Sequence, residues 1–257
     1  MTIVDDYEDA DLSEYSESGQ GEGDIVSTAA VGDHALEILN VDTTTQSEYV
    51  VSTEGLPAYP QAGDTFEVYL SLDDPSDNNG FFWFAVQSET VDPERYVLKL
   101  DGDDNELQVF YADGDGGKEV ILATNASYFK SISEGYLRFE IDWTYAGSRS
   151  GFLNVSGETA VVGSHGDHSY VYAGGDPVRN TGAGPGFFRE SGTPVDVGGS
   201  GVDITVRVYD GGTKVDEAAG SLELDGLPTT GGIGGSVSSY FGYGDAATYV
   251  DHISILD

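Results

Sequence analysis

The chain has 257 residues, with 46 Asp and Glu against 10 Lys and Arg, and a formal net charge of −36. Phosphate binding needs clustered basic side chains, so this charge excludes a nucleic-acid partner, while 39% hydrophobic residues exclude a disordered acidic tail. No apolar run approaches the ~18 residues that cross a bilayer, so no membrane insertion is expected.

So many carboxylates repel one another at ordinary ionic strength. At molar salt the Debye length falls to about 3 Å, which screens the repulsion while the carboxylates keep the surface hydrated. The composition therefore predicts a halophilic protein from an extreme halophile. The chain has no cysteine, which excludes disulfides and thiolate metal sites.

Apolar residues alternate with polar ones through most of the chain, a period typical of half-buried strands. Turn signals rich in Gly, Asp and Asn separate these segments, and no long segment keeps a helical period. We therefore expect an all-β sandwich forming a single domain over residues 1–257. The clearest strands cover Phe66 to Leu72, Tyr96 to Leu100, Leu107 to Tyr111, Leu137 to Trp143 and Ile204 to Val208.

Two segments depart from simple alternation. Phe81 to Val86 is apolar at every position, so one face fills the core. We expect the other face to be covered too, because large exposed apolar patches are a liability; the alternative is a surface that stacks sugar rings. Residues 145–202 are Gly-rich and lack steady alternation, which indicates an insertion containing a strand or two.

Several stretches carry a family resemblance: Val4–Tyr15, Leu137–Trp143, Ile204–Thr213, Gly231–Gly234 and Ala247–Ile255. They resemble the laminin-G-like, concanavalin-A-like lectin/glucanase domains common in haloarchaeal surface and viral proteins. The resemblance implies a jelly-roll sandwich of two antiparallel sheets, with the chain termini paired side by side. The insertion at 145–202 interrupts the family pattern.

The resemblance also implies a calcium ion that ties the acidic N-terminal segment to the last strand. Its ligands would be Asp6, Glu8 and Asp251, since Ca²⁺ prefers oxygen ligands from carboxylates and carbonyls. The alternative for these residues is a solvated acidic face.

Related glucanases carry Glu-x-Asp-x-x-Glu on one strand, which supplies a nucleophile and an acid/base. Glu140 and Asp142 fill the first two positions, but Tyr145 fills the third, so the residue that protonates the leaving group is absent. We therefore expect no catalytic residue, and interpret Arg138, Glu140 and Asp142 as the polar face of a strand. A glucanase-like glycoside hydrolase is the alternative.

Aromatic residues in Gly-rich segments are the candidates for contact with carbohydrate or a protein partner, because Tyr combines apolar area with a hydroxyl group. These candidates are Tyr240, Phe241 and Tyr243 near the C-terminus, and Tyr170 and Tyr172 in the insertion. Packing at the sandwich rim is the alternative for the first group.

These observations favour a non-catalytic, surface-displayed binding or structural module, and most directly a virion protein such as a capsid decoration, turret or tail fibre. We expect a homo-oligomer that contacts other virion or surface proteins and binds host-surface glycan. The N-terminus lacks the basic and hydrophobic regions of a secretory signal, which favours display on the virion surface over secretion. The haloarchaeal cytoplasm is the alternative location, and a purely architectural protein is a further alternative function.

Overall fold

The computed structural model divides the chain into two compact units. The first comprises Met1–Tyr145, Asp203–Leu222 and Pro228–Asp257, and the second comprises Ala146–Val202 and Glu223–Leu227. The structure describes residues 1–18, 22–40, 48–73, 78–90, 92–102, 104–131, 135–146, 201–224, 226–239 and 246–256, together with the strands of the segment 161–195.

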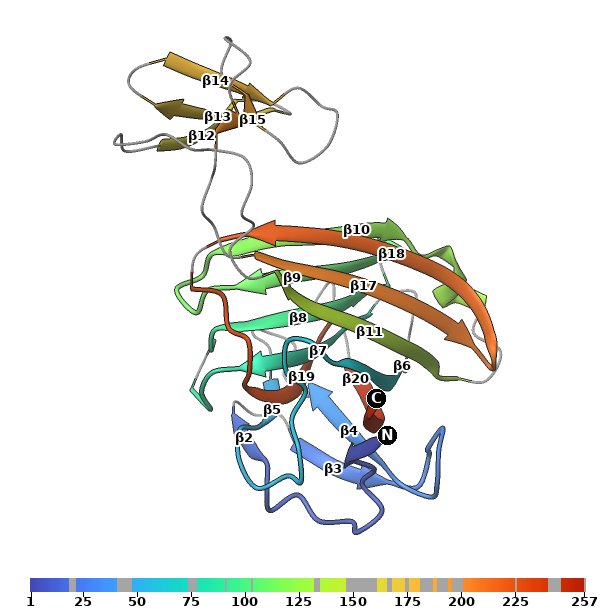
Figure 1. Ribbon diagram of the computed structural model, residues 1–257. Coiled ribbons are helices and arrows are strands. Elements are labelled where there is room, and N and C mark those ends of the chain that lie inside the picture. The colour runs from blue at the N-terminus through green and yellow to red at the C-terminus, as the bar shows by residue number, and fades with distance from the viewer. Residues whose placement is uncertain are drawn as a thin grey trace. The chain divides into compact units, whose positions relative to one another are not determined.

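One layer of the first unit is an eight-stranded sheet in which strands distant in sequence lie side by side (Figure 1). Its order is β18-β17-β11-β6-β20-β4-β3, and β1 pairs with β20 outside this path. The strands are β18 (Thr213–Glu223), β17 (Gly201–Asp210), β11 (Leu137–Ala146), β6 (Thr65–Leu72), β20 (Ala246–Leu256), β4 (Ala35–Asn40), β3 (Glu22–Val26) and β1 (Thr2–Asp5).

The other layer is a seven-stranded sheet with the order β10-β9-β8-β7-β19-β5-β2. Its strands are β10 (Lys118–Asn125), β9 (Glu106–Ala112), β8 (Arg95–Asp101), β7 (Asn78–Val86), β19 (Gly232–Ser239), β5 (Glu48–Ser52) and β2 (Ser16–Ser18). The described pairings are antiparallel, and the only helical element among the described residues is the 3₁₀ turn Ser127–Ser131. The all-β jelly-roll sandwich expected from the sequence is confirmed.

Aromatic side chains fill the space between the two sheets. Phe66 of β6 meets Phe84 of β7 with ring centroids 5.3 Å apart, and Trp143 of β11 lies 5.4 Å from Phe84. Tyr96 of β8 stacks on Phe84 at 5.2 Å. All four rings are buried, so every second residue of these strands supplies the core and the residues between them face outward.

The two termini lie side by side on the eight-stranded sheet (Figure 1). β1 runs antiparallel to β20, with Thr2 opposite Ile255 and Ile3 opposite Ser254. This pairing confirms the arrangement of termini implied by the resemblance. It brings the acidic N-terminal segment close to the last strand.

The second unit contains a five-stranded antiparallel sheet with the order β12-β13-β14-β15-β16. The sequence predicted only a strand or two here, because short strands interrupted by Gly and Pro show little alternation. A single domain with an insertion stays a prediction. The strands of this five-stranded sheet are β12 (Val161–His165), β13 (His168–Ala173), β14 (Asp176–Asn180), β15 (Phe187–Phe188) and β16 (Pro194–Val195).

No helix in the described part of the chain is long and apolar enough to span a membrane.

Candidate functional site

The outer face of the eight-stranded sheet carries an arginine flanked by tyrosines. Arg138 on β11 lies directly opposite Tyr69 on β6 in the register of the two strands. Tyr209 lies on β17, which pairs with β11 on its other side. Each of the three follows a buried, core-facing residue in its strand, so strand alternation turns its side chain away from the core.

These side chains line a pocket of about 280 Å³, which we call the tyrosine pocket. Tyr136, just before β11, adds a third ring. Its hydroxyl donates a 2.6 Å hydrogen bond to the carbonyl of Thr28, in the loop between β3 and β4. The complete lining is Ala29, Ala30, Tyr69, Tyr136, Arg138, Tyr209 and Gly211.

Arg138 is held in one orientation by two contacts. Its guanidinium lies 3.9 Å from the centre of the Tyr209 ring, and Nη1 donates a 2.8 Å hydrogen bond to Glu67 Oε2. The other oxygen of Glu67 accepts a 3.1 Å hydrogen bond from Ser254 Oγ. Burial lowers the pKa of Arg138, but the hydrogen bond and charge of Glu67 outweigh burial and raise it overall. Arg138 and Glu67 together therefore carry no net charge.

The hydroxyl groups of Tyr69 and Tyr136 stay protonated across the neutral range. Burial is the largest cause that raises the pKa of Tyr69, and the charge of Glu67 adds to it. Burial likewise raises the pKa of Tyr136. Protonated phenols both donate and accept hydrogen bonds, so the pocket offers both kinds of partner beside aromatic faces.

The two glucanase-like carboxylates lie on the same face of β11, and Glu140 belongs to an ion-pair network. Glu140 Oε1 is 2.8 Å from Arg207 Nη1, and Glu140 Oε2 is 3.7 Å from Arg138 Nη1. Asp142 Oδ1 accepts a hydrogen bond from Thr144 Oγ1 at 3.3 Å. Glu140 is therefore paired with two guanidinium groups, one from β11 and one from β17.

Two of the predicted calcium ligands bind the loop that lines the pocket. Asp251 Oδ2 on β20 accepts hydrogen bonds from the amides of Ala30 (2.7 Å) and Val31 (2.8 Å). Glu8 Oε1 accepts them from Asp33 (2.7 Å) and His34 (3.0 Å). Carboxylates from opposite ends of the chain thus hold residues 30–34.

The three predicted calcium ligands have different hydrogen-bond partners in the structure. Among the described residues, no group of three or more His, Asp or Glu side chains is arranged to hold a metal. Asp6 Oδ1 accepts a hydrogen bond from the amide of Glu8 at 3.3 Å. Asp251 Oδ1 alone is buried without a partner, and burial raises the pKa of this carboxyl group. A calcium ion held by these three residues stays a prediction.

The predicted aromatic contacts cannot be placed on this pocket. Tyr240, Phe241 and Tyr243 lie outside the described residues. Tyr170 and Tyr172 fall on β13, of which only the strand pairing is described. These five residues stay predictions.

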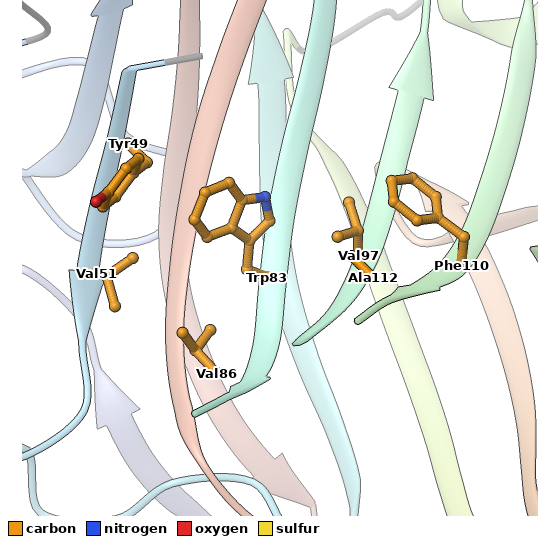
Figure 2. Packing of buried hydrophobic residues seen from close by; sticks show 7 residues of the cluster. All are labelled: Tyr49, Val51, Trp83, Val86, Val97, Phe110 and Ala112. Carbon is orange, nitrogen blue, oxygen red and sulfur yellow. The ribbon is translucent and has the colours of Figure 1, made fainter. Parts of the chain in front are cut away.

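A second aromatic surface covers the outer face of the seven-stranded sheet, and we call it the outer apolar layer (Figure 2). A β-bulge at Ala85, with φ 53°, turns Val86 to the same face as Trp83. Trp83 is only 2% exposed, which confirms the expected burial and leaves little of its ring for a sugar. The layer consists of Tyr49, Val51, Trp83, Val86, Val97, Phe110 and Ala112, with Phe81 packed against it.

Cations lie over three rings on this surface. Arg95 is 4.1 Å from the Trp83 ring centre, Lys118 is 3.9 Å from that of Phe110, and Lys99 is 5.9 Å from that of Phe81. Ion pairs with Asp92 and Asp101 hold Arg95 and Lys99. These contacts cap the apolar rings and stabilise the layer.

No family model and no curated protein matches the sequence. Solved structures match in strand arrangement. A legume lectin-like domain from Entamoeba histolytica is 10% identical, with a TM-score of 0.48 and coverage of 100% of this chain and 96% of that chain. A Bacillus licheniformis beta-glucanase is 9% identical, with a TM-score of 0.46 and coverage of 100% and 99%. Carbohydrate binding module CBM66 from Bacillus subtilis is 9% identical, with a TM-score of 0.43 and coverage of 95% and 96%. At these values the similarity assigns no activity to the chain.

The sequence analysis missed the tyrosine pocket because its residues come from separate strands and loops. Arg138 was interpreted only as part of the polar face of a strand. One signal was present: in a chain with 46 acidic residues, the outward positions of β6, β11 and β17 include Tyr69, Arg138 and Tyr209. Aromatic and basic residues at solvent-facing strand positions indicate a contact surface.

Proposed function

We propose that this chain is a non-catalytic carbohydrate-binding module and that the tyrosine pocket holds a sugar residue of a glycan. One observation carries the proposal: three tyrosine rings meet Arg138, which is paired with Glu67, at one cavity of about 280 Å³. Pockets that combine apolar walls with a few fixed polar groups are the usual form of a small-ligand site. The carbohydrate-binding module and lectin-like domain among the structural neighbours are consistent with this proposal.

The chemistry of the pocket suits an uncharged sugar. A sugar ring has an apolar face that packs on aromatic rings, and hydroxyl groups around its edge that donate and accept hydrogen bonds. Tyrosine hydroxyls supply both kinds of partner, and Arg138 supplies donors. Because Glu67 neutralises Arg138, the pocket has no excess positive charge to select an anion.

These contacts also suit a protein that works in concentrated salt. Ions screen attraction between separated charges, with a Debye length of about 3 Å at 1 M salt. Ring packing and direct hydrogen bonds act at shorter range and need no long-range attraction. The pocket therefore suits the saline environment that the net charge of −36 predicts.

The experiment is a glycan-array screen in about 3 M KCl, the screening regime expected for this protein, followed by calorimetry on any hit. Tyr69→Ala should lose most of the affinity. Tyr145→Ala is the matched control, because Tyr145 lies on the same sheet, is 37% exposed and does not line the pocket. Equal losses in the two variants, or no glycan bound by the native protein, would remove the proposal.

The non-catalytic part of the proposal is supported by Glu140, whose carboxylate lies between Arg138 and Arg207. We expect no release of reducing ends when the protein is incubated with β-glucans at molar salt. Turnover that disappears in Glu140→Gln would instead establish the glucanase alternative.

We also propose display on the virion of a haloarchaeal virus, which rests on the sequence resemblance and on the acidic composition. Detection of the chain in purified particles by mass spectrometry would support this location. Its presence only in the host cytosol would contradict it.

A further inference from the structure

The loop between β3 and β4 forms one wall of the tyrosine pocket, through Ala29 and Ala30. It has no regular secondary structure from residue 27 to residue 34. A loop of this kind keeps one shape only if its backbone amides find partners. Four of its amides, in two consecutive pairs, point at two carboxylate oxygens.

We propose that Glu8 and Asp251 are positioning residues of the tyrosine pocket, which hold this loop through its backbone amides and not through a shared metal ion. The inference rests on the proposed function for its binding consequence only. Glu8 lies beyond β1 and Asp251 lies on β20, so the pairing of the two termini brings both carboxylates to the loop.

Gly32 shows that the loop is fitted to Glu8. It lies between the two amide pairs and has a φ of 76°, a value that favours glycine. A Cβ atom at this position would also overlap the carboxylate of Glu8. Glycine is therefore needed both for the turn and for the approach of Glu8.

The pocket side of the loop has its own anchor. The hydroxyl of Tyr136, which lines the pocket, donates to the carbonyl of Thr28 at 2.6 Å. The loop is thus fixed at its start by Tyr136, in its middle by Asp251 and at its end by Glu8. Loss of the hydrogen bonds to Asp251 or to Glu8 would let the pocket wall formed by Ala29 and Ala30 move.

The geometry argues against a cation shared by these carboxylates. Two N–H groups point at Glu8 Oε1, and two more point at Asp251 Oδ2. The positive ends of these dipoles already satisfy the two oxygens and would repel a cation placed there. A neutral side chain with a carbonyl oxygen at position 8 would satisfy the same amides, whereas loss of the negative charge would weaken the binding of a calcium ion.

The test compares Glu8→Gln, Glu8→Ala and native protein by amide hydrogen exchange and by affinity for a glycan identified on the array. Glu8→Ala should speed exchange at Asp33 and His34 by about tenfold, the loss expected for two hydrogen bonds. It should also weaken glycan binding. Glu8→Gln should keep slow exchange and most of the affinity, with or without EDTA.

Glu119→Ala is the control, because it removes the same charge from an exposed position of β10, which belongs to the other sheet. It should change neither readout. The proposal is overturned if Glu8→Gln behaves like Glu8→Ala, if EDTA removes slow exchange in the native protein, or if Glu8→Ala leaves Asp33 and His34 protected. If the native protein binds no glycan, the proposed function fails, while the exchange data still decide whether Glu8 holds the loop.

Asp251→Asn should leave amide exchange at Ala30 and Val31 slow, because the asparagine carbonyl can accept the same hydrogen bonds. Fast exchange at these amides in a folded variant would contradict the proposed role of Asp251.

Discussion

The guanidinium of Arg138 stacks 3.9 Å from the ring centre of Tyr209, while its Nη1 atom donates a hydrogen bond to Glu67. A planar, delocalised cation makes both contacts at once, whereas a lysine ammonium lacks the planar surface and the forked donors. The pair therefore defines the shape of one side of the tyrosine pocket.

Replacement of this arginine by lysine should weaken binding although it preserves charge. We expect Arg138→Lys to lower glycan affinity by about tenfold, through loss of stacking and donor geometry. Arg207→Lys is the control, because Arg207 pairs with Glu140 but does not line the pocket. Calorimetry on both variants checks this prediction, and a loss of equal size in each would contradict it.

Replacement of glycine by alanine should have different effects on stability at two positions. A Cβ atom on Gly232 of β19 would overlap the backbone carbonyl of Ser52 on the neighbouring strand, whereas one on Gly212 would meet nothing within 4 Å. Gly232→Ala should lower the free energy of unfolding by roughly 1–3 kcal/mol, as overpacking does. Gly212→Ala should stay close to native. Urea denaturation of both variants in the same salt tests this contrast, and equal stabilities would show that β19 has more room than the structure indicates.

Stability should depend steeply on salt. The net charge of −36 opposes folding wherever its repulsion is unscreened. The midpoint of thermal unfolding should rise as KCl increases to about 3 M, and circular dichroism should show loss of β structure at low salt. Sucrose is the control, because it favours compact states without screening charge. A midpoint independent of KCl would argue against the halophilic interpretation.

Stability should also rise as the pH falls from about 7 to about 5. Burial is the largest cause that raises the pKa of Asp5 and of Asp251 above the ordinary value. At a pH above the ordinary pKa of an Asp carboxyl group, the folded state therefore binds more protons than the unfolded state. A fall in pH then favours the folded state. Protonation of surface carboxylates lessens repulsion in the same direction. Urea denaturation at the two pH values tests the sign.

Asp251→Asn should flatten this pH dependence, because the asparagine does not titrate. Greater stability of the native protein at about pH 7 than at about pH 5 would contradict the assignment. The pKa values of Glu8 and Glu217 are lowered, and both side chains are exposed. Their protonation therefore affects the free energy of unfolding only at more acid pH.

Strong alternation made several strands predictable from the sequence. β6, β8, β9, β11 and β17 each have a nearly continuous apolar face that the opposite sheet buries, so local pattern and tertiary structure agree. β18 was not predicted, because Thr213–Glu223 has few apolar residues and lies at the edge of its sheet. Pairing with β17, and not its own side chains, makes this segment a strand.

The site was less predictable than the fold. Alternation shows that Arg138 faces outward, but only the pairing of β11 with β6 and β17 brings Tyr69 and Tyr209 beside it. Glu8 and Asp251 were selected because they are acidic and near the paired termini, and the structure does bring both to one loop. Their binding to backbone amides depends on the turn at Gly32, which the sequence analysis did not connect to either carboxylate.

The crystal structure of the protein with a glycan hit from the array, grown in about 3 M KCl, tests the central claim most directly. We predict a sugar residue in the tyrosine pocket, in contact with Tyr69, Tyr209 and Arg138. A sugar bound on the outer apolar layer around Trp83, with the tyrosine pocket empty, would contradict it.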